Sequence, residues 1–325
     1  MAPFQGITNR VFRKVYTRHF PGIDKLFTPF FTSIHKKNIS SSRSKELIGV
    51  TENGIPVVPQ ILSKDADEML RFAIFCKELG FDEINWNLGC PYPRVANKMR
   101  GSGMLPHPEI VDEILQQFMP KTPVKLSVKM RLGFKEPEEI FQLIPILNKY
   151  NITEVTVHAR IGKQLYKGSV NHNIFKKVIQ QSTIPTGYNG DIFTKNDFIN
   201  LTNSISGISF LMLGRGLLVD PFLPAHIKNI EIPNLEGQKE IIRKFIDDLY
   251  YERRKQHHDG LQTLGNMKEY WWYLSCSFDN PHKVFSLIKK KKNFEEYEDA
   301  VNRIFNDYNW LGQEADLFKK EQTMK

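Results

Sequence analysis

Short apolar runs alternate with amphipathic helical patterns along the first 230 or so residues, and this alternation limits the fold more than any other feature. After an N-terminal stub at residues 1–6, the apolar runs fall at residues 26–30, 57–62, 83–87, 124–131, 154–158, 184–188 and 210–213. Helical patterns lie between them at residues 8–20, 66–79, 108–118, 138–150, 174–181 and 195–201. Strands that alternate with helices pair in parallel. With the stub counted as the end of a first strand, eight such units in about 230 residues predict a closed (β/α)8 TIM barrel.

The remaining residues have a helical pattern only, at residues 237–255, 261–278, 282–290 and 295–310. We therefore expect an α/β protein with a TIM-barrel catalytic domain at residues 1–232 and a C-terminal all-helical domain at residues 233–325. The most apolar patch of the helical domain, residues 271–274, is interpreted as its core. An open doubly wound sheet is the alternative for the first domain. No Gly-x-Gly-x-x-Gly motif follows an early strand, however, so a Rossmann domain is not favoured.

The charge balance favours a polyanionic partner. The chain carries 45 basic and 36 acidic side chains, a net charge of +9. Residues 1–230 hold 29 of the basic and 19 of the acidic side chains, so the surplus belongs to the barrel. Cys76, Cys90 and Cys276 are odd in number and far apart, which indicates a reducing compartment and neither a disulfide framework nor a metal site. With no membrane-length apolar run and no signal-peptide pattern, we expect a cytoplasmic protein.

One short stretch has the composition of a reactive loop. Asn85 and Asn87 interrupt a strand that then stops at Gly89-Cys90-Pro91, where proline cannot continue the ladder. A glycine-rich loop follows at residues 101–105. A lone cysteine is more often a small buried residue. The flanking amides, glycines and proline favour a reactive cysteine at the C-terminal end of a strand instead.

The other predicted strands also end in polar residues, which is where a TIM barrel places its chemistry. These residues are Gln60, Lys129, Arg131, His158, Arg160, the turn Asn189-Gly190-Asp191 and the turn Gly214-Arg215-Gly216. Each alone is compatible with a satisfied core group. Together, the last two turns predict a phosphate site, and an amide and a lysine at the mouth suit flavin mononucleotide (FMN), with Gln60 at the ring edge and Lys129 near its N1–C2 carbonyl. A thiol with an ordinary pKa is mostly protonated at neutral pH, so Cys90 is a better acid than nucleophile. A flavin with a thiol acid is suited to reducing a conjugated C=C bond.

The chain resembles the tRNA-dihydrouridine synthases along the whole barrel and, less specifically, in its helical tail. The motifs that carry the resemblance are Ala2-Pro3-Phe4-x-Gly6-x-Thr8, Asn87-Leu88-Gly89-Cys90-Pro91, Gly101-Ser102-Gly103-Met104-Leu105, Val128-Lys129-Met130-Arg131-Leu132-Gly133, Val157-His158-Ala159-Arg160, Asn189-Gly190-Asp191 and Leu213-Gly214-Arg215-Gly216. The chain departs from the family pattern at Phe4, Asn9 and Ile161-Gly162. The resemblance implies FMN, NADPH as reductant, and tRNA as substrate.

The resemblance also implies roles for individual residues. Reduced FMN delivers hydride to uracil C6, and Cys90 protonates C5. The positions matching FMN contacts are Pro3, Phe4, Gln5, Gln60, Lys129, His158, Asn189, Gly190, Asp191, Gly214 and Arg215. For tRNA, we expect Asn87 to line the flavin–uracil pocket, and Arg94, Lys98, Arg100, Arg160 and Tyr166 to contact the substrate, with Tyr92, Lys36, Lys37, Lys163 and Lys167 available nearby. For any one of these lysines taken alone, a solvated loop charge is the better interpretation.

Two other classes of function remain open at this point. A flavin barrel acting on a free small molecule, in the manner of dihydroorotate dehydrogenases, would use the same catalytic residues, but would need neither the basic rim nor the helical appendage. A non-catalytic RNA-binding protein built on a decayed enzyme would not need Cys90, Lys129, His158 and Gly214-Arg215. The motifs do not distinguish between positions in tRNA.

Overall fold

The alternating apolar runs form parallel strands, as expected. The structure, a computed structural model, describes residues 1–34, 44–47, 51, 53–256 and 260–315; Lys36 and Lys37 lie outside these residues. Its strands are β1 (Leu26–Phe27), β2 (Val57–Val58), β3 (Gln60–Ile61), β4 (Glu83–Leu88), β5 (Lys125–Gly133), β6 (Ile152–Ile161), β7 (Thr186–Asn189) and β8 (Phe210–Leu211). β1 pairs with β2, and β3 to β8 form a six-stranded sheet in chain order, all in parallel.

The N-terminal stub lies between the last strand and the first one. The backbone N–H of Ala2 donates to the carbonyl oxygen of Leu213 just after β8, at 2.7 Å. The amino group of Met1 donates to the carbonyl oxygen of Lys25 just before β1, also at 2.7 Å. The stub therefore takes the place of a barrel strand, and the predicted TIM barrel is confirmed.

The third predicted strand, residues 57–62, is divided into β2 and β3 at Pro59. Proline has no N–H to donate to a ladder, although its carbonyl oxygen still accepts the N–H of Asn85 at 2.8 Å. A single parallel bridge between Phe31 and Ile61 then joins the two sheets. The barrel is thus continuous across the break.

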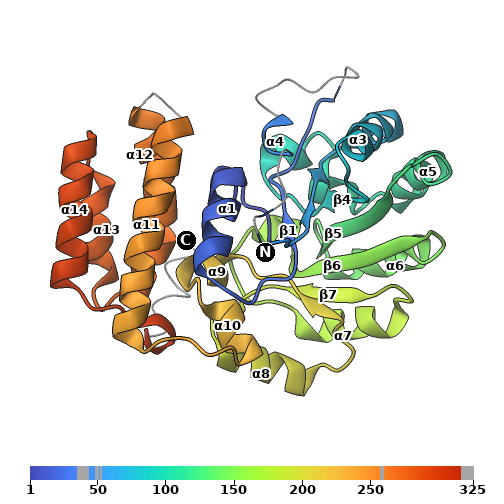
Figure 1. The fold of residues 1–325 in the computed structure, drawn as a ribbon. Helices are drawn as coiled ribbons and strands as arrows, with labels where there is room; N and C mark the ends of the chain where they lie inside the picture. Colours follow the sequence, from blue (N-terminus) through green and yellow to red (C-terminus); the bar gives the residue numbers. More distant parts are fainter. Residues whose placement is uncertain (35–43, 48–50, 52, 257–259, 316–325) are drawn as a thin grey trace.

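Helices cover the outside of the barrel and continue beyond it (Figure 1). Asn9, one departure from the family pattern, caps the first helix by accepting the N–H of Phe12 at 3.1 Å. The barrel helices are α1 (Arg10–His19), α3 (Ala66–Glu78), α4 (Pro93–Ala96), α5 (Pro108–Phe118), α6 (Ile140–Leu147), α7 (His172–Gln181), α8 (Lys195–Ser204), α9 (Arg215–Val219) and α10 (Leu223–Lys228). The C-terminal helices are α11 (Leu235–Gln256), α12 (Gly260–Leu274), α13 (Pro281–Lys289) and α14 (Phe294–Asp307). The predicted boundary at residue 232 falls between α10 and α11. Among the described residues, no helix has both the length and the apolar composition of a membrane-spanning segment.

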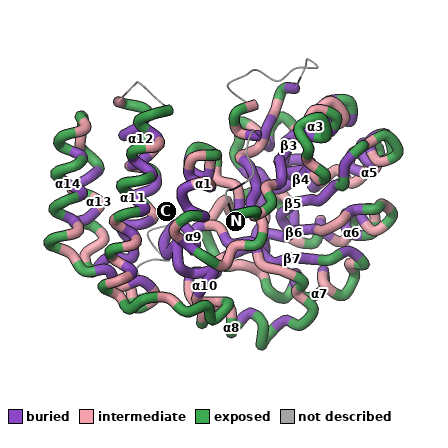
Figure 2. Tube along the Cα trace, viewed as in Figure 1, coloured by how far each residue is buried: buried purple, intermediate pink, exposed green. Residues whose placement is uncertain are grey.

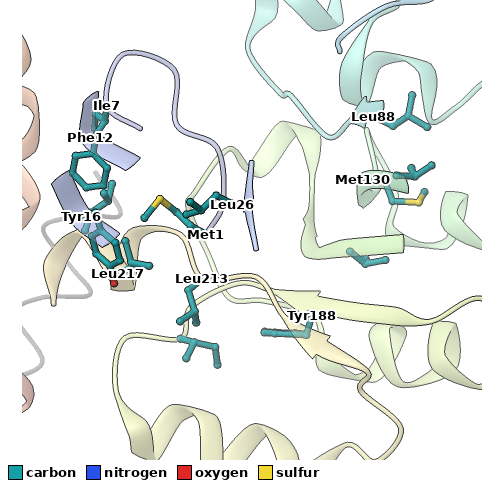
Figure 3. Packing of buried hydrophobic residues seen from close by; sticks show 14 of the residues in the cluster. Met1, Ile7, Phe12, Tyr16, Leu26, Leu88, Met130, Tyr188, Leu213 and Leu217 are labelled. Carbon is teal, nitrogen blue, oxygen red and sulfur yellow. The ribbon is translucent and has the colours of Figure 1, made fainter. Parts of the chain in front are cut away.

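Buried residues follow the strands of the barrel and the inner faces of its helices (Figure 2). Apolar residues that are far apart in sequence, such as Met1, Leu26, Leu213 and Leu217, meet where the stub closes the barrel (Figure 3). This packing holds the stub, and the residues that follow it, beside the C-terminal end of β8.

The helical domain packs against α1 and the residue that follows it through aromatic side chains. Phe20 meets Phe245 of α11 at a centroid distance of 4.9 Å, and Phe12 meets Tyr270 of α12 at 5.2 Å. α1 therefore forms part of the barrel and of the interdomain core at once.

The prediction that residues 271–274 form the helical core is right for two of them only. Trp271 and Leu274 are fully buried. Trp272 is 38% exposed and packs on Phe285 of α13, while the ring of Tyr273 meets Phe4 of the barrel. Four consecutive helical residues point in four directions about 100° apart, so they cannot all share one core.

Candidate active site

A cavity opens at the C-terminal ends of the strands, where the sequence predicts the chemistry. Backbone pairing joins five of the predicted polar positions in three pairs, because Asn87 pairs with Lys129, and Arg131 and Asn189 both pair with His158. The residues lining the cavity include Pro3, Phe4, Gln5, Asn87, Cys90, Tyr92, Lys129, Arg131, His158, Tyr166, Asn189, Gly190, Asp191, Gly214 and Arg215. The structure thus brings together most of the predicted site.

The asparagines of β4 belong to a buried chain of amide hydrogen bonds. Asn87 Nδ2 donates to Gln60 Oε1 at 2.8 Å, and Gln60 Nε2 donates to Asn85 Oδ1 at 2.8 Å. Asn85 Nδ2 in turn donates to Ser127 Oγ at 2.9 Å. Gln60 is fully buried and is not among the residues that line the cavity. Its observed contacts hold Asn87, which does line the cavity.

Cys90 lies at the cavity wall on a loop held by its own backbone. Its carbonyl oxygen accepts both the N–H of Ser102 at 3.0 Å and the hydroxyl of Ser102 at 3.1 Å. Gly101, the residue before Ser102, has φ +56°, and a Cβ on it would come within 2.7 Å of the Cys90 carbonyl oxygen. The motif from Gly101 onward therefore fastens the cysteine loop, and only glycine fits at its first position.

Cys90 is buried, with 7% of its surface exposed. Burial raises its pKa above the ordinary value, against the opposing effects of the Tyr92 backbone N–H and the cations of Arg131 and Lys129. The thiol is therefore protonated at neutral pH, which is the state that a proton donor requires.

Lys129, Arg131 and His158 line the same cavity as Cys90. Burial and the nearby Arg131 lower the pKa of Lys129 to about 8. Burial, followed by the surrounding cations, lowers the pKa of His158 well below its usual value, so the imidazole is neutral. Arg131 donates through Nε to the carbonyl oxygen of Gly89 at 3.1 Å and through Nη1 to that of Ile161 at 2.8 Å. Arg131 was predicted at a strand end but was given no role in binding, although its spacing of two from Lys129 puts both on one face of β5.

An arginine–aspartate cluster lies at the cavity wall next to His158. Asp191 accepts from Arg160 at 2.8 and 2.6 Å and from Arg215 at 2.7 Å. The guanidinium of Arg215 lies 4.6 Å from the ring centroid of Tyr166, which places the predicted base-contacting tyrosine directly against it. Asn189 Nδ2 donates to the carbonyl oxygen of Met212 at 2.7 Å and so holds the β7 turn to the end of β8.

The residues predicted to contact the substrate occupy three different settings. Tyr166 lines the cavity, whereas Arg160 is fully buried behind it, with its guanidinium on Asp191. Arg94 in α4 and Lys98 just after this helix are exposed. Arg100 is half-buried, 3.9 Å from the buried carboxylate of Glu68. The structure therefore separates the predicted outer contacts from those at the cavity. Among the described residues, no cluster of three or more histidine, cysteine or acidic side chains is arranged to hold a metal ion.

A family model and similar relatives of known function indicate the same protein family for this chain. The model of the dihydrouridine synthase (Dus) family matches residues 1–309. A tRNA-dihydrouridine(16) synthase of Neisseria meningitidis (serogroup A, serotype 4A) is 26% identical, over 95% of each chain. The tRNA-dihydrouridine synthase B of Pasteurella multocida is 30% identical, over 90% of this chain and 89% of the relative. A tRNA-dihydrouridine(16) synthase of Vibrio vulnificus is 34% identical, over 74% of each.

A solved structure, that of a variant of NCR from Zymomonas mobilis, resembles this chain with a TM-score of 0.50. It covers 72% of this chain and 87% of that one, at 12% identity. This likeness concerns the fold alone.

Proposed function

Because the chain belongs to the dihydrouridine synthase family, we propose that it is an oxidoreductase that reduces the C5=C6 bond of uridine in tRNA, with FMN as cofactor and NADPH as reductant. The family is flavin-dependent. We place the target at position 16, because relatives with that name align over most of this chain. Membership of this family favours tRNA reduction over the two alternatives, a reductase of small molecules and a non-catalytic RNA-binding protein. With tRNA as the substrate, we expect the reaction to take place in the cytoplasm.

The cavity suits an anionic, planar ligand such as FMN. Among its lining residues, Lys129, Arg131 and Arg215 are cations and Asp191 is the sole carboxylate. At Gly214, a Cβ would come within 3.3 Å of the Phe4 ring, so glycine keeps a narrow space open beside Phe4.

We assign the phosphate of FMN to the two glycine turns, where Arg215 and the backbone at Gly214 and Gly190 would hold it. Lys129 would meet the ring's N1–C2 edge. Among the described residues it has no ion-pair partner, so its charge is available there. Bound in this way, FMN supplies the hydride for uracil C6.

The residues of the chain supply the remaining chemistry. Cys90 holds a proton at Sγ and donates it to C5, leaving a thiolate near Arg131 and Lys129, whose charges favour the ionised form. Tyr166 would contact the uracil or a neighbouring base. Arg94 and Lys98 would bind phosphates, and these contacts would help to offset the cost of about a few kcal/mol for turning the target base out of the tRNA. Gln60 does not line the cavity in this structure, so it would affect the site by holding Asn87 in place.

The single observation that carries the proposal is the buried thiol of Cys90 in the same cavity as Lys129. The test uses purified protein supplied with FMN, NADPH and an unmodified tRNA transcript, and measures dihydrouridine by mass spectrometry. We expect dihydrouridine at position 16 and none in a transcript with cytidine at that position. A flavin-free spectrum after adding FMN would contradict the cofactor, and dihydrouridine at another position would contradict the target.

A further inference from the structure

The loop formed by Pro3, Phe4 and Gln5 lines the cavity and continues into a tight turn before α1. The N–H of Phe4 donates to Thr8 Oγ1 at 2.7 Å, and the N–H of Thr8 donates to the Phe4 carbonyl oxygen at 3.1 Å. These bonds close the turn on itself. They do not by themselves hold it against the rest of the molecule.

The helical domain contacts this turn at three positions. The ring of Tyr273 meets that of Phe4 edge-on, with centroids 6.1 Å apart. A Cβ on Gly6 would lie 2.9 Å from Oε2 of Glu269, so this carboxylate is close to the glycine. Glu269 and Tyr273 are four residues apart on α12 and therefore share one helical face.

The third contact comes from α11. Arg253 Nη2 donates to the carbonyl oxygen of Ile7 at 3.2 Å, across 246 residues of sequence. The guanidinium is fully buried, and its Nε and Nη1 have no hydrogen-bond partner among the described residues. Burial lowers the pKa of Arg253 to about 10, opposed first by the charge of Glu269.

A buried cation with two unpaired nitrogen donors does not favour folding, because its desolvation is only partly offset. An apolar side chain of similar length would fill the same space without that penalty. The contact made by Arg253 is with the turn behind a cofactor-facing loop, which gives the residue a role other than stability.

We propose that Arg253 is a positioning residue through which the helical domain holds the Phe4–Thr8 turn in the conformation that binds the cofactor. Tyr273 and Glu269 support the same turn from α12. The ligand in this inference rests on the function proposed above. The positioning itself does not, because it concerns contacts within the chain.

The test compares Arg253→Met with Arg254→Met. Arg254 is the neighbouring arginine, half-exposed and paired with Glu298 at 3.0 Å. The FMN dissociation constant is measured by quenching of flavin fluorescence, and amide hydrogen exchange is measured in flavin-free protein for peptides covering residues 4–9. For Arg253→Met we expect FMN affinity about tenfold weaker, faster exchange in these peptides and an unchanged or higher melting temperature. Arg254→Met should match the parent, and Arg253→Lys should recover part of the affinity.

Equal FMN affinity and equal exchange in Arg253→Met and the parent would overturn the proposal. If Arg253→Met does not fold, Tyr273→Leu replaces it, and the same two measurements decide. Should the parent itself fail to bind FMN, the proposed cofactor is wrong, and the exchange rates still decide whether Arg253 positions the turn.

Discussion

Asn87 Oδ1 accepts the backbone N–H of Cys90 at 2.9 Å, so the side chain of a β4 residue determines where the cysteine loop begins. The same oxygen accepts the N–H of Gly89 at 3.0 Å. Asn87 thus links the buried amide chain, which ends at Ser127, to the proposed acid. The position of the thiol depends on a polar network below the cavity.

Asn87→Ala should both destabilise the protein and slow the reaction, because two buried N–H groups are then without an acceptor. Each unsatisfied donor costs about 1–3 kcal/mol. Thermal unfolding and single-turnover dihydrouridine formation measure the two effects. Asn97→Ala, at an exposed asparagine of the same loop, is the control. An unchanged rate in Asn87→Ala would mean that the amide does not position the cysteine.

Cys90→Ala should retain FMN, fold and NADPH oxidation by oxygen, yet abolish most dihydrouridine formation. A positioned acid contributes on the order of 10²–10⁴-fold, and Cys90→Ser should lie between the two because a hydroxyl donates a proton less readily. The measurement is single-turnover yield with pre-reduced enzyme, and Cys276→Ala, at a buried cysteine of the helical domain, is the control. Parental rates in Cys90→Ala would assign the proton to another group.

FMN affinity should fall as the pH rises through about 8, the pKa of Lys129 in the free protein. Below that pH the ammonium is charged and attracts the anionic ligand, which in turn raises the pKa of the bound lysine. Between the free and bound pKa values, binding therefore weakens with rising pH. The FMN phosphate, with a second pKa near 6, does not change charge in this range. Titrating affinity from pH 7 to 9 should show this slope in the parent, and Lys129→Met should abolish it.

Arg215→Ala should weaken FMN binding by about 1.5–3 kcal/mol, the contribution of a charge-assisted phosphate contact. The variant also leaves Asp191 with Arg160 as its remaining arginine partner, which keeps that carboxylate paired. Dissociation constants from fluorescence quenching measure the effect. Arg243→Ala, which breaks a surface pair with Asp247, should bind FMN as the parent does. Equal constants for Arg215→Ala and the parent would rule out the phosphate assignment.

Replacing Arg94 and Lys98 together with alanine should weaken tRNA binding and reduce its dependence on salt, without changing FMN affinity. Removing one phosphate-binding cation makes the plot of log affinity against log salt less steep by roughly one. Filter binding at several salt concentrations gives the slope. Lys176 and Lys177, exposed on α7, are the matched control pair. Arg100 is left in place because Glu68 lies 3.9 Å from it, so its removal would also disturb the loop. A parental slope would show that Arg94 and Lys98 do not contact phosphates.

Features that depend on neighbours in the chain could be predicted from the sequence alone. The alternation of apolar runs with helical patterns predicted the barrel, because periodicity follows from local backbone geometry. Turn residues marked the strand ends, and parallel strands bring their carboxyl ends to one rim. That is why Asn87, Cys90, Lys129, His158 and Asn189 were predicted to lie together, as the structure places them.

Which side chains satisfy one another became clear only from the folded chain. Gln60 engages amides of β4, and Arg160 lies buried against Asp191, 31 residues away. Spacing predicts the face on which a residue lies but not the partner it meets across the core. Residues 271–274 are divided between the helical core, the surface and a contact with the barrel because of the way the helical domain packs against the barrel. The contact of Arg253 with Ile7 has the same origin. Both depend on packing between elements that are distant in sequence, which local preferences do not encode.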